Sequence, residues 1–310
     1  MAGIPTEIVN TWLLANGHFT NPLSSQLLRS YTNDVYEIFS GDEKYILKIY
    51  GAGWKNEAEV RYEIALLKHL ADKGLPVANA IAPCNGKTLH QFNERFSVLY
   101  EYAAGRKPEP PFTPQLYYAF GKAIASMHEL SNDFKTSWHR QPLDLDYTID
   151  KPLEHIIPLL SRHEQRDFLC GVTDMIKTGL NRLEAQGLDW GPIHADATLD
   201  NLHVTPDGQI VLYDFEEGPG WRAADLQGWA FQGQAHQEKW HAFQQGYQAV
   251  RPLRSADLEA APYLTIAWDI WGIQIDLDRR ILHQGHEQVR TYLDEQLNNI
   301  KGRLQQFGWL

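Results

Sequence analysis

Polar residues flank a short predicted β-hairpin that spans residues 202–213. Two β-rich runs make up this hairpin, and the Pro-Asp-Gly sequence at 206–208 favours a tight turn between them. Asp196 and Asn201 precede the hairpin, and Asp214 follows it. Since a hairpin returns the chain to the edge at which it started, we expect Asn201 and Asp214 to lie at the same mouth.

These residue types match the needs of phosphoryl transfer. The reaction needs a carboxylate beside the acceptor hydroxyl, and it needs oxygen ligands for the Mg²⁺ that neutralises the phosphates. Asp196 supplies a carboxylate on the loop before the hairpin, and Asn201 and Asp214 supply an amide oxygen and a second carboxylate. Two unrelated polar turns would seldom combine all three, so we favour the chemical interpretation.

The same segment resembles a known family. It reads HxDxxxxN from His194 to Asn201, then the hairpin, then Asp214-Phe215-Glu216, and later the run 220–226, Gly-Trp-Arg-Ala-Ala-Asp-Leu. In this order the motifs resemble those of the aminoglycoside phosphotransferase and choline-kinase-like group. The resemblance covers roughly residues 30–280. It implies a protein-kinase-like fold and the ATP- and Mg²⁺-dependent phosphorylation of a small-molecule hydroxyl.

The resemblance also implies roles for single residues. Asp196 matches the residue that accepts the proton of the acceptor hydroxyl, and Asn201 and Asp214 match the metal ligands. His194 matches a histidine with a structural packing role. Asp225 matches an aspartate that braces the catalytic loop through hydrogen bonds to its backbone.

The chain departs from the family's pattern at two positions. Ala195 stands where relatives usually have glycine, which is tolerated unless that residue must take a positive φ. Glu216 stands where many relatives have glycine or aspartate. An acid at this position either assists metal binding, as the resemblance to choline-kinase-like proteins implies, or is a surface charge.

The first third of the chain has the pattern of a small α/β layer. Residues 35–39 and 44–50 predict one hairpin, and residues 87–92 and 96–102 predict a second. Between the hairpins, apolar residues recur at helical spacing over 56–73. The order is therefore strand, strand, helix, strand, strand.

A Pro- and Gly-rich segment at 103–111 marks a change in composition and predicts a lobe boundary. Apart from the short hairpin, the remainder predicts helices at 114–130, 165–186, 222–232, 238–250, 258–283 and a last one that ends at 307. With the resemblance, this predicts an α+β, bilobal protein-kinase-like fold. A small N-terminal antiparallel sheet plus a helix forms a nucleotide-gripping lobe at 1–102, and a larger, mainly helical catalytic and acceptor-binding lobe occupies 103–310.

Lys48 is a charged residue inside the otherwise apolar run 44–50. An inward-facing charge in a strand is costly without a partner, so we expect a role for Lys48, and an edge-strand lysine turned to solvent is the alternative. The resemblance implies a lysine that binds the nucleotide phosphates, and we assign that role to Lys48. Its candidate partners on the following helix are Glu57, Glu59 and Glu63. We choose Glu63, which matches the family's glutamate, with Glu59 as the second candidate.

Two further nucleotide-binding segments are expected. No GxGxxG is present, so the polar loop 30–34, between a helical stretch and the first strand, is assigned to the phosphates, with Asn33 as the family-matched residue. The hinge is expected at Tyr100-Glu101-Tyr102-Ala103, where backbone groups of Tyr100, Glu101 and Tyr102 would meet the adenine.

The acceptor site rests on the predicted helix 258–283. Trp268 and Trp271 share one stripe of this helix, and Asp269 and Asp276 share the neighbouring stripe. The resemblance places such helices along the acceptor cleft, where acids and aromatics suit an amine-bearing substrate. Burial in the core is the alternative for the tryptophans, and pairing with nearby arginines on the helix surface is the alternative for Asp276. Glu216 is the fifth candidate acceptor residue.

The composition of the chain argues against nucleic acids and membranes as binding partners. Acidic residues outnumber basic ones, 39 to 28, for a net charge of −11, so the chain lacks the basic field that drives binding to nucleic acid or to anionic membranes. No apolar run approaches the ~20 residues of a membrane span, and no signal peptide is visible. The only two cysteines, Cys84 and Cys170, lie far apart, which is typical of a reducing compartment. We therefore expect a cytoplasmic protein that acts on a small molecule.

The sequence thus predicts an ATP- and Mg²⁺-dependent O-phosphotransferase for a small-molecule hydroxyl, and an amine-bearing acceptor such as an aminoglycoside or another antibiotic is one interpretation. A metabolic kinase for choline, homoserine or a sugar is the alternative. A nucleotide-binding pseudokinase is less favoured, because Asp196, Asn201 and Asp214 are all present. A protein kinase is disfavoured too, since no APE-like segment exists and the interval from Asp214 to Gly220 is too short for an activation loop.

Overall fold

The computed structural model describes residues 3–20, 22–82, 86–215, 217–226 and 237–310. The chain folds into two compact units, each built from three segments. The first unit comprises Met1–Phe112, Leu130–Arg140 and Thr198–Glu216, and the second comprises Thr113–Glu129, Gln141–Ala197 and Glu217–Leu310. The functional boundary that the sequence places at 102/103 stays a prediction.

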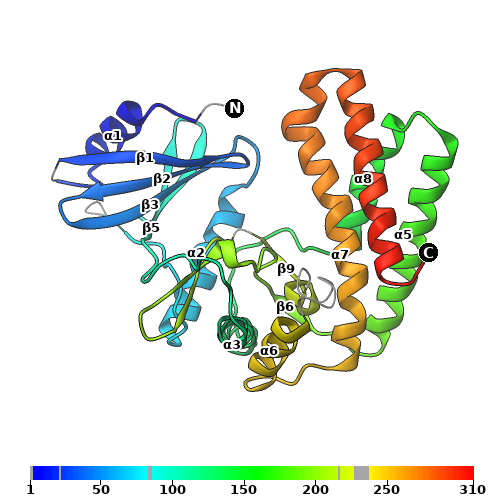
Figure 1. Ribbon diagram of the computed structural model, residues 1–310. Coiled ribbons are helices and arrows are strands. Elements are labelled where there is room, and N and C mark those ends of the chain that lie inside the picture. The colour runs from blue at the N-terminus through cyan, green and yellow to red at the C-terminus, as the bar shows by residue number, and fades with distance from the viewer. Residues whose placement is uncertain (1–2, 21, 83–85, 216, 227–236) are drawn as a thin grey trace. The chain divides into compact units, whose positions relative to one another are not determined.

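The first unit contains a five-stranded antiparallel sheet with the strand order β1-β2-β3-β5-β4 (Figure 1). The strands are β1 (Leu23–Ser30), β2 (Asn33–Ser40), β3 (Glu43–Tyr50), β4 (Leu89–Phe92) and β5 (Arg95–Glu101). The two predicted hairpins are confirmed as β2–β3 and β4–β5. Helix α1 (Thr6–Ala15) precedes the sheet, and α2 (Glu57–Asp72) confirms the predicted helix between the hairpins.

Strand alternation separates two faces of this sheet. One face packs against α1 and forms an apolar core in which Val9, Leu13, Tyr36, Ile38, Leu47, Ile49 and Leu99 are all buried. Lys48 lies between Leu47 and Ile49 on β3, so its side chain points to the opposite face, where it is 4% exposed. The apolar pattern of β3 therefore fixes the side of the sheet on which the charge lies.

A further hairpin lies in the last segment of the first unit, 198–216. Strands β7 (Leu202–Val204) and β8 (Ile210–Leu212) pair antiparallel, as the sequence predicts. The backbone of Val204 exchanges two hydrogen bonds with Arg106 (2.8 and 3.0 Å). Gly105 makes this close approach possible, because its φ is +89° and a Cβ there would lie 2.3 Å from the Val204 carbonyl oxygen.

The second unit is mainly helical. Its helices are α3 (Pro114–Leu130), α4 (Lys151–Ile156), α5 (His163–Ala185), α6 (Gln237–Gln248), α7 (Ser255–Asp276) and α8 (His286–Gln306), and β6 (Trp190–Pro192) pairs with β9 (Pro219–Trp221). Helices α5, α7 and α8 run side by side (Figure 1). Helices α3 and α6 approach closely through two glycines, since a Cβ on Gly121 would lie 2.0 Å from the Phe243 carbonyl oxygen and one on Gly246 would lie 1.9 Å from that of Tyr118.

Some sequence expectations need correction. The helical stretch expected before residue 30 is wrong, because residues 23–30 form the edge strand β1. The helix expected at 258–283 ends at Asp276 and continues as π and 3₁₀ turns to Gln284. Of the helix expected at 222–232, the residues Arg222–Leu226 form a 3₁₀ turn, and the remainder lies outside the described residues.

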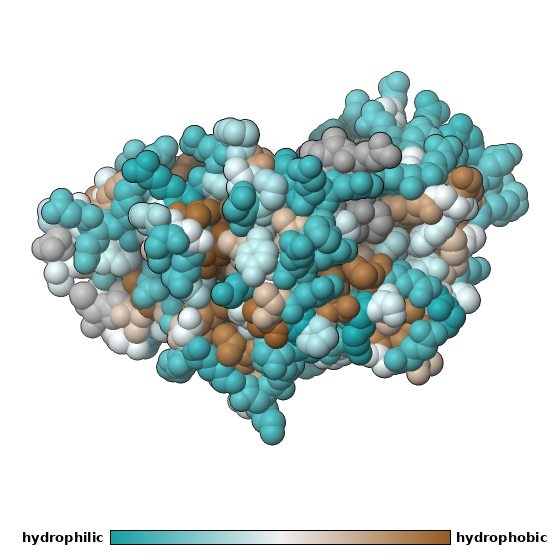
Figure 2. All heavy atoms as spheres, turned by 60° about the horizontal axis from the view of Figure 1, so that its bottom comes forward, coloured by the Kyte–Doolittle hydropathy of each residue, from teal (hydrophilic) through white to brown (hydrophobic). Residues whose placement is uncertain are grey.

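One face of the molecule is mostly hydrophilic. Hydrophilic residues cover most of the face drawn in Figure 2, and hydrophobic residues appear there in smaller patches. Among the described residues, no helix has the length and apolar character needed to cross a membrane.

Candidate active site

A cavity of about 430 Å³ opens within the first unit. Its walls come from the sheet, from α2, from the segment after β5 and from the β7–β8 hairpin. The lining includes the expected residues Lys48, Glu63, Tyr100, Glu101, Tyr102, Asn201 and Asp214. Apolar side chains from Val35, Ile46 and Ala78 complete one wall. Charged groups beside an apolar wall are what a nucleotide, with its phosphates and its base, requires.

Lys48 and Asp214 meet in this cavity. Lys48 Nζ lies 2.7 Å from Asp214 Oδ1 and 3.7 Å from Glu63 Oε1. The other candidate acids are engaged elsewhere, since Glu59 closes the N-terminal capping box of α2 and Glu57 pairs with Arg61. The structure therefore brings the chosen Glu63 to Lys48, and it excludes a lysine turned to solvent.

Glu63 is held from several sides. The hydroxyl groups of Tyr50 and Tyr100 donate to its two carboxylate oxygens at 2.8 and 2.7 Å. Arg140, from the segment 130–140, lies 3.6 Å away, and both side chains are 1% exposed. Burial raises the pKa of Tyr100 well above its usual value, and the Glu63 charge adds to this effect, so the hydroxyl stays a donor.

Asp214 has a separate cation on each carboxylate oxygen. Arg29 Nη2 lies 2.9 Å from Oδ2, opposite the Lys48 contact on Oδ1. Burial alone would raise the pKa of Asp214, but the charges of Lys48 and Arg29 outweigh it and hold the pKa well below its usual range. The carboxylate is therefore ionised. Its backbone has a φ of +70°, an uncommon conformation for a residue other than glycine.

Asn201 lies next to Asp214, as the hairpin predicts. The backbone N–H of Tyr213 donates to the carbonyl oxygen of Asn201 at 3.1 Å, and both Asn201 and Asp214 line the cavity. An ionised carboxylate and an amide oxygen are hard ligands that suit Mg²⁺. Within the described residues, no group of three or more His, Cys, Asp or Glu side chains is arranged to hold a metal. Mg²⁺ needs no such cage, because phosphate oxygens and water usually complete its coordination.

Asn33, the residue expected to contact phosphate, does not line the cavity, whereas the expected hinge residues Tyr100, Glu101 and Tyr102 do. Asn33 begins β2, is 2% exposed, accepts the backbone N–H of Gly51 at 3.1 Å and does not line the cavity. Arg29, which the sequence analysis did not select, does line it. The signal in the sequence was the positive charge of Arg29 just before the polar loop 30–34. It was not used, because a helix was expected there and not a strand.

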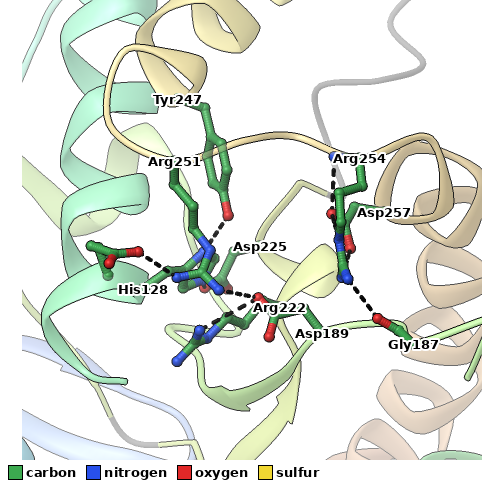
Figure 3. Close-up of polar contacts among 10 residues, drawn as sticks. His128, Gly187, Asp189, Arg222, Asp225, Tyr247, Arg251, Arg254 and Asp257 are labelled. Atoms are coloured by element: carbon green, nitrogen blue, oxygen red, sulfur yellow. Dashed lines mark hydrogen bonds and ion pairs between the residues drawn. The ribbon is translucent and has the colours of Figure 1, made fainter. Parts of the chain in front are cut away.

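The second unit contains the loop that carries Asp196. The Asp225 carboxylate accepts the backbone N–H of His194 at 2.8 Å and that of Ala195 at 2.7 Å. His128 Nε2 donates to the same carboxylate at 2.8 Å, so its Nδ1 accepts the hydroxyl of Tyr247, also at 2.8 Å (Figure 3). Asp225 therefore braces the loop as expected, and α3 and α6 hold Asp225 in place.

A second set of polar contacts supports the same region. Arg251 bridges Glu129 at 2.7 Å and Asp189 at 2.5 Å, and Arg222 lies 3.4 Å from Asp189 (Figure 3). Burial alone would raise the pKa of Asp189, but the nearby Arg222 and Arg251 lower it. These contacts join the end of α3, the chain before β6 and the chain after α6.

Of the candidate acceptor residues, Trp268 makes a direct contact with this loop. Trp268 Nε1 donates to the Ala195 carbonyl oxygen at 3.2 Å, and its ring lies 6.0 Å from that of Trp271. Asp269 instead pairs with Arg303 on α8 at 2.5 Å, and Asp276 accepts the hydroxyl of Tyr292 at 2.8 Å. Their roles toward an acceptor stay predictions. Glu216 lies outside the described residues.

Comparison with known proteins assigns the chain to a family. Residues 25–256 match the family described as the phosphotransferase enzyme family, APH. An uncharacterized protein of Deinococcus radiodurans is 34% identical over 79% of this chain and 74% of its own length. Homoserine kinase of Xanthobacter autotrophicus is 29% identical over 71% of this chain and 69% of its own length.

Solved structures share the fold. A microcompartment-associated aminopropanol kinase superposes with a TM-score of 0.76 at 20% identity, over 97% of this chain and 99% of that one. Amicoumacin kinase hAmiN, solved in complex with AMP-PNP, Ca²⁺ and Ami, has a TM-score of 0.73 at 20% identity, over 89% of this chain and 88% of that one.

Proposed function

Because this chain belongs to the phosphotransferase enzyme family, it is a small-molecule kinase that phosphorylates a hydroxyl group, and we propose that its acceptor carries an amino group as well. The phosphate donor is ATP, which agrees with the ATP analogue in a solved neighbour. The proposal for the acceptor rests on the aromatic side chains at the loop that carries Asp196.

The donor side uses the cavity of the first unit. Lys48, held near Glu63, binds the phosphates of ATP, and Tyr100, Glu101 and Tyr102 line the part assigned to the base. Asp214 and Asn201 are the residues that would hold Mg²⁺, which when bound neutralises charge on the phosphates. The ionised state of Asp214 supports this assignment, since a protonated carboxyl group would be a poor ligand.

Asp196 accepts the proton of the acceptor hydroxyl as that oxygen attacks the terminal phosphorus. Its side chain is exposed, as a group that contacts an incoming substrate must be. The loop is fixed on both sides, because Asp225 holds the backbone N–H groups of His194 and Ala195 while Trp268 donates to the Ala195 carbonyl oxygen. A fixed loop supplies the orientation on which such proton transfer depends.

The hydrogen bond from Trp268 to Ala195 carries the proposal for an amine. It attaches an aromatic side chain to the residue beside Asp196. Trp271 and Tyr147 extend this aromatic group, and the ring centroids of these two residues lie 5.9 Å apart. Aromatic faces attract ammonium groups by roughly 0.5–2 kcal/mol. Aminopropanol and homoserine, the compounds named for two similar proteins, each carry an amino group and a hydroxyl group. Amicoumacin kinase supports an antibiotic acceptor as the second candidate.

A panel of paired acceptors tests this proposal. Each amino alcohol is assayed beside the diol in which a hydroxyl replaces the amino group, and ADP release is measured with ATP and Mg²⁺. Choline, a sugar, homoserine and an aminoglycoside complete the panel. We expect the amino member of a pair to have the higher kcat/KM, and equal values within all pairs would contradict the amine requirement.

Asp196→Asn and Trp271→Leu separate catalysis from acceptor binding. Asp196→Asn should lower turnover by about 10²–10⁴ and leave ATP affinity unchanged, because a positioned general base contributes that range. Trp271→Leu should raise KM for the amino acceptor and leave KM for ATP unchanged. Normal turnover in Asp196→Asn would remove this residue from the proposed mechanism.

A further inference from the structure

Arg29 owes its position to an irregularity in the edge strand. Strand β1 pairs with β2 in regular register from Leu23 opposite Ser40 to Leu27 opposite Tyr36. The register then shifts, so that Arg29 lies opposite Val35 and Leu28 is the extra residue of a β-bulge. A bulge bends the strand and changes the direction in which its side chains point.

The bulge turns two consecutive residues toward the cavity. In a regular strand, neighbouring side chains point to opposite faces of the sheet. Here Leu28 and Arg29 both line the cavity. An arginine is thereby brought from the sheet edge to the group of residues that the proposed function assigns to the nucleotide phosphates.

Lys48 and Arg29 hold Asp214 in different ways. The Lys48 side chain is 4% exposed and also has Glu63 nearby, so it is fixed in its place. The Arg29 side chain is 49% exposed and extends from an edge strand. A third cation at the cavity, Lys107, pairs with Asp200 at 2.6 Å. Of the two cations that hold Asp214, Arg29 is therefore the one with room to exchange its carboxylate partner for another anion.

We propose that Arg29 is a further nucleotide-binding residue, whose guanidinium leaves Asp214 and binds the terminal phosphates when the nucleotide occupies the cavity. This assignment rests on the proposed function. Asp214 needs its oxygens for the metal, and the planar fork of a guanidinium matches two phosphate oxygens as well as it matches a carboxylate. The contact exchanges one charge-assisted pair for another, so Arg29 stays neutralised in both states.

Calorimetric titration of Arg29→Gln with a nucleotide series tests the assignment without using turnover. The series is adenosine, AMP, ADP with Mg²⁺ and ATP with Mg²⁺. We expect the affinity for ATP with Mg²⁺ to fall about tenfold or more, because a charge-assisted contact is lost. Adenosine and AMP should bind to Arg29→Gln as they do to the unchanged protein. Arg29→Lys keeps the charge but loses the planar fork, so its affinity for ATP with Mg²⁺ should lie between those of the unchanged protein and Arg29→Gln.

Arg61→Gln is the matched control. Arg61 is a half-exposed arginine of the same unit that pairs with Glu57 on α2 outside the cavity, so its loss removes an equal charge. ATP affinity in Arg29→Gln that equals that of the control would overturn the assignment, as would tighter ATP binding or an equal loss for adenosine. Failure of the unchanged protein to bind ATP would instead overturn the proposed function, and the assignment with it.

Discussion

The backbone N–H of Ala195 donates to Asp225 Oδ1 at 2.7 Å. This contact fixes Ala195 in the left-handed region, with a φ of +65°. A residue with a Cβ pays about 1–2 kcal/mol for that conformation, and glycine does not. The loop therefore carries local strain next to Asp196, and its hydrogen bonds to Asp225 and Trp268 offset the cost.

Replacing Ala195 by glycine should release this strain. Ala195→Gly is expected to raise the free energy of unfolding by about 0.5–1 kcal/mol, because the relieved strain exceeds the extra freedom that glycine gives the unfolded chain. Chemical denaturation measures the change. Ala195→Val is the opposite control and should destabilise, since a branched side chain suits a positive φ even less. Lower stability in Ala195→Gly would refute the strain argument.

Removing the Asp214 carboxylate should abolish the tightening of ATP binding by Mg²⁺. Asp214→Ala deletes the ionised group that we assign to the metal, whereas Asn201→Ala deletes a neutral ligand and should weaken the effect less. Calorimetric titration of ATP with and without Mg²⁺ measures both variants. A metal dependence that persists unchanged in Asp214→Ala would exclude this residue as a ligand.

Asp269 and its partner should affect acceptor binding in opposite directions. Burial raises the pKa of Asp269, and the pairing with Arg303 opposes that effect. If an acceptor amine shares this carboxylate, Asp269→Asn should raise the acceptor KM roughly tenfold, since a charge-assisted contact is lost. Arg303→Gln removes the competing cation and should lower that KM. An unchanged acceptor KM in both variants would leave the pair a link between α7 and α8 only.

Stability should fall as pH is lowered because of His18. This histidine is 2% exposed, and neither ring nitrogen has a hydrogen-bond partner within the described part of the chain. Burial, aided by the nearby His90, lowers its pKa from 6.5 to about 4. The unfolded chain therefore binds the extra proton first, and stability is lost as pH falls from about 6.5 toward 4, by up to about 3 kcal/mol.

Denaturation at pH 7.5, 6 and 5 measures this loss. His18→Phe keeps an aromatic ring beside Trp12 but takes no proton, so it should flatten the dependence on pH. His163→Gln is the control, because His163 is exposed in the second unit and should leave the slope unchanged. A slope in His18→Phe equal to that of the unchanged protein would refute the assignment.

The sequence predicted those parts of the site that regular patterns determine. A charge inside the apolar run of β3 singled out Lys48, and the match to the family's glutamate, with the helix-core positions that follow it, favoured Glu63 over Glu59. The β7–β8 hairpin placed Asn201 beside Asp214, since its register follows from a short turn. In each case the determining contacts are local or belong to one repeating pattern.

The sequence did not predict the features that depend on irregular or distant contacts. Strand β1 is mostly exposed, so it has no apolar alternation to distinguish it from a helix, and its bulge at Leu28 has no signature. The pairing of Asp269 with Arg303 joins two helices, and spacing within one helix does not show it. The positive φ of Ala195 did have a signal, which was the glycine expected at this position.

The carboxylate of Glu63 accepts two tyrosine hydroxyls, and two buried cations lie within 4 Å of it. Any rotation of α2 that withdrew this group would separate Arg140 from the Glu63 carboxylate and leave Lys48 with Asp214 as its carboxylate partner, and breaking a buried pair costs about 3–5 kcal/mol. A regulator that silenced the enzyme by swinging this helix would have to supply that much binding energy. The contacts of Glu63 within the first unit thus oppose such a movement of α2.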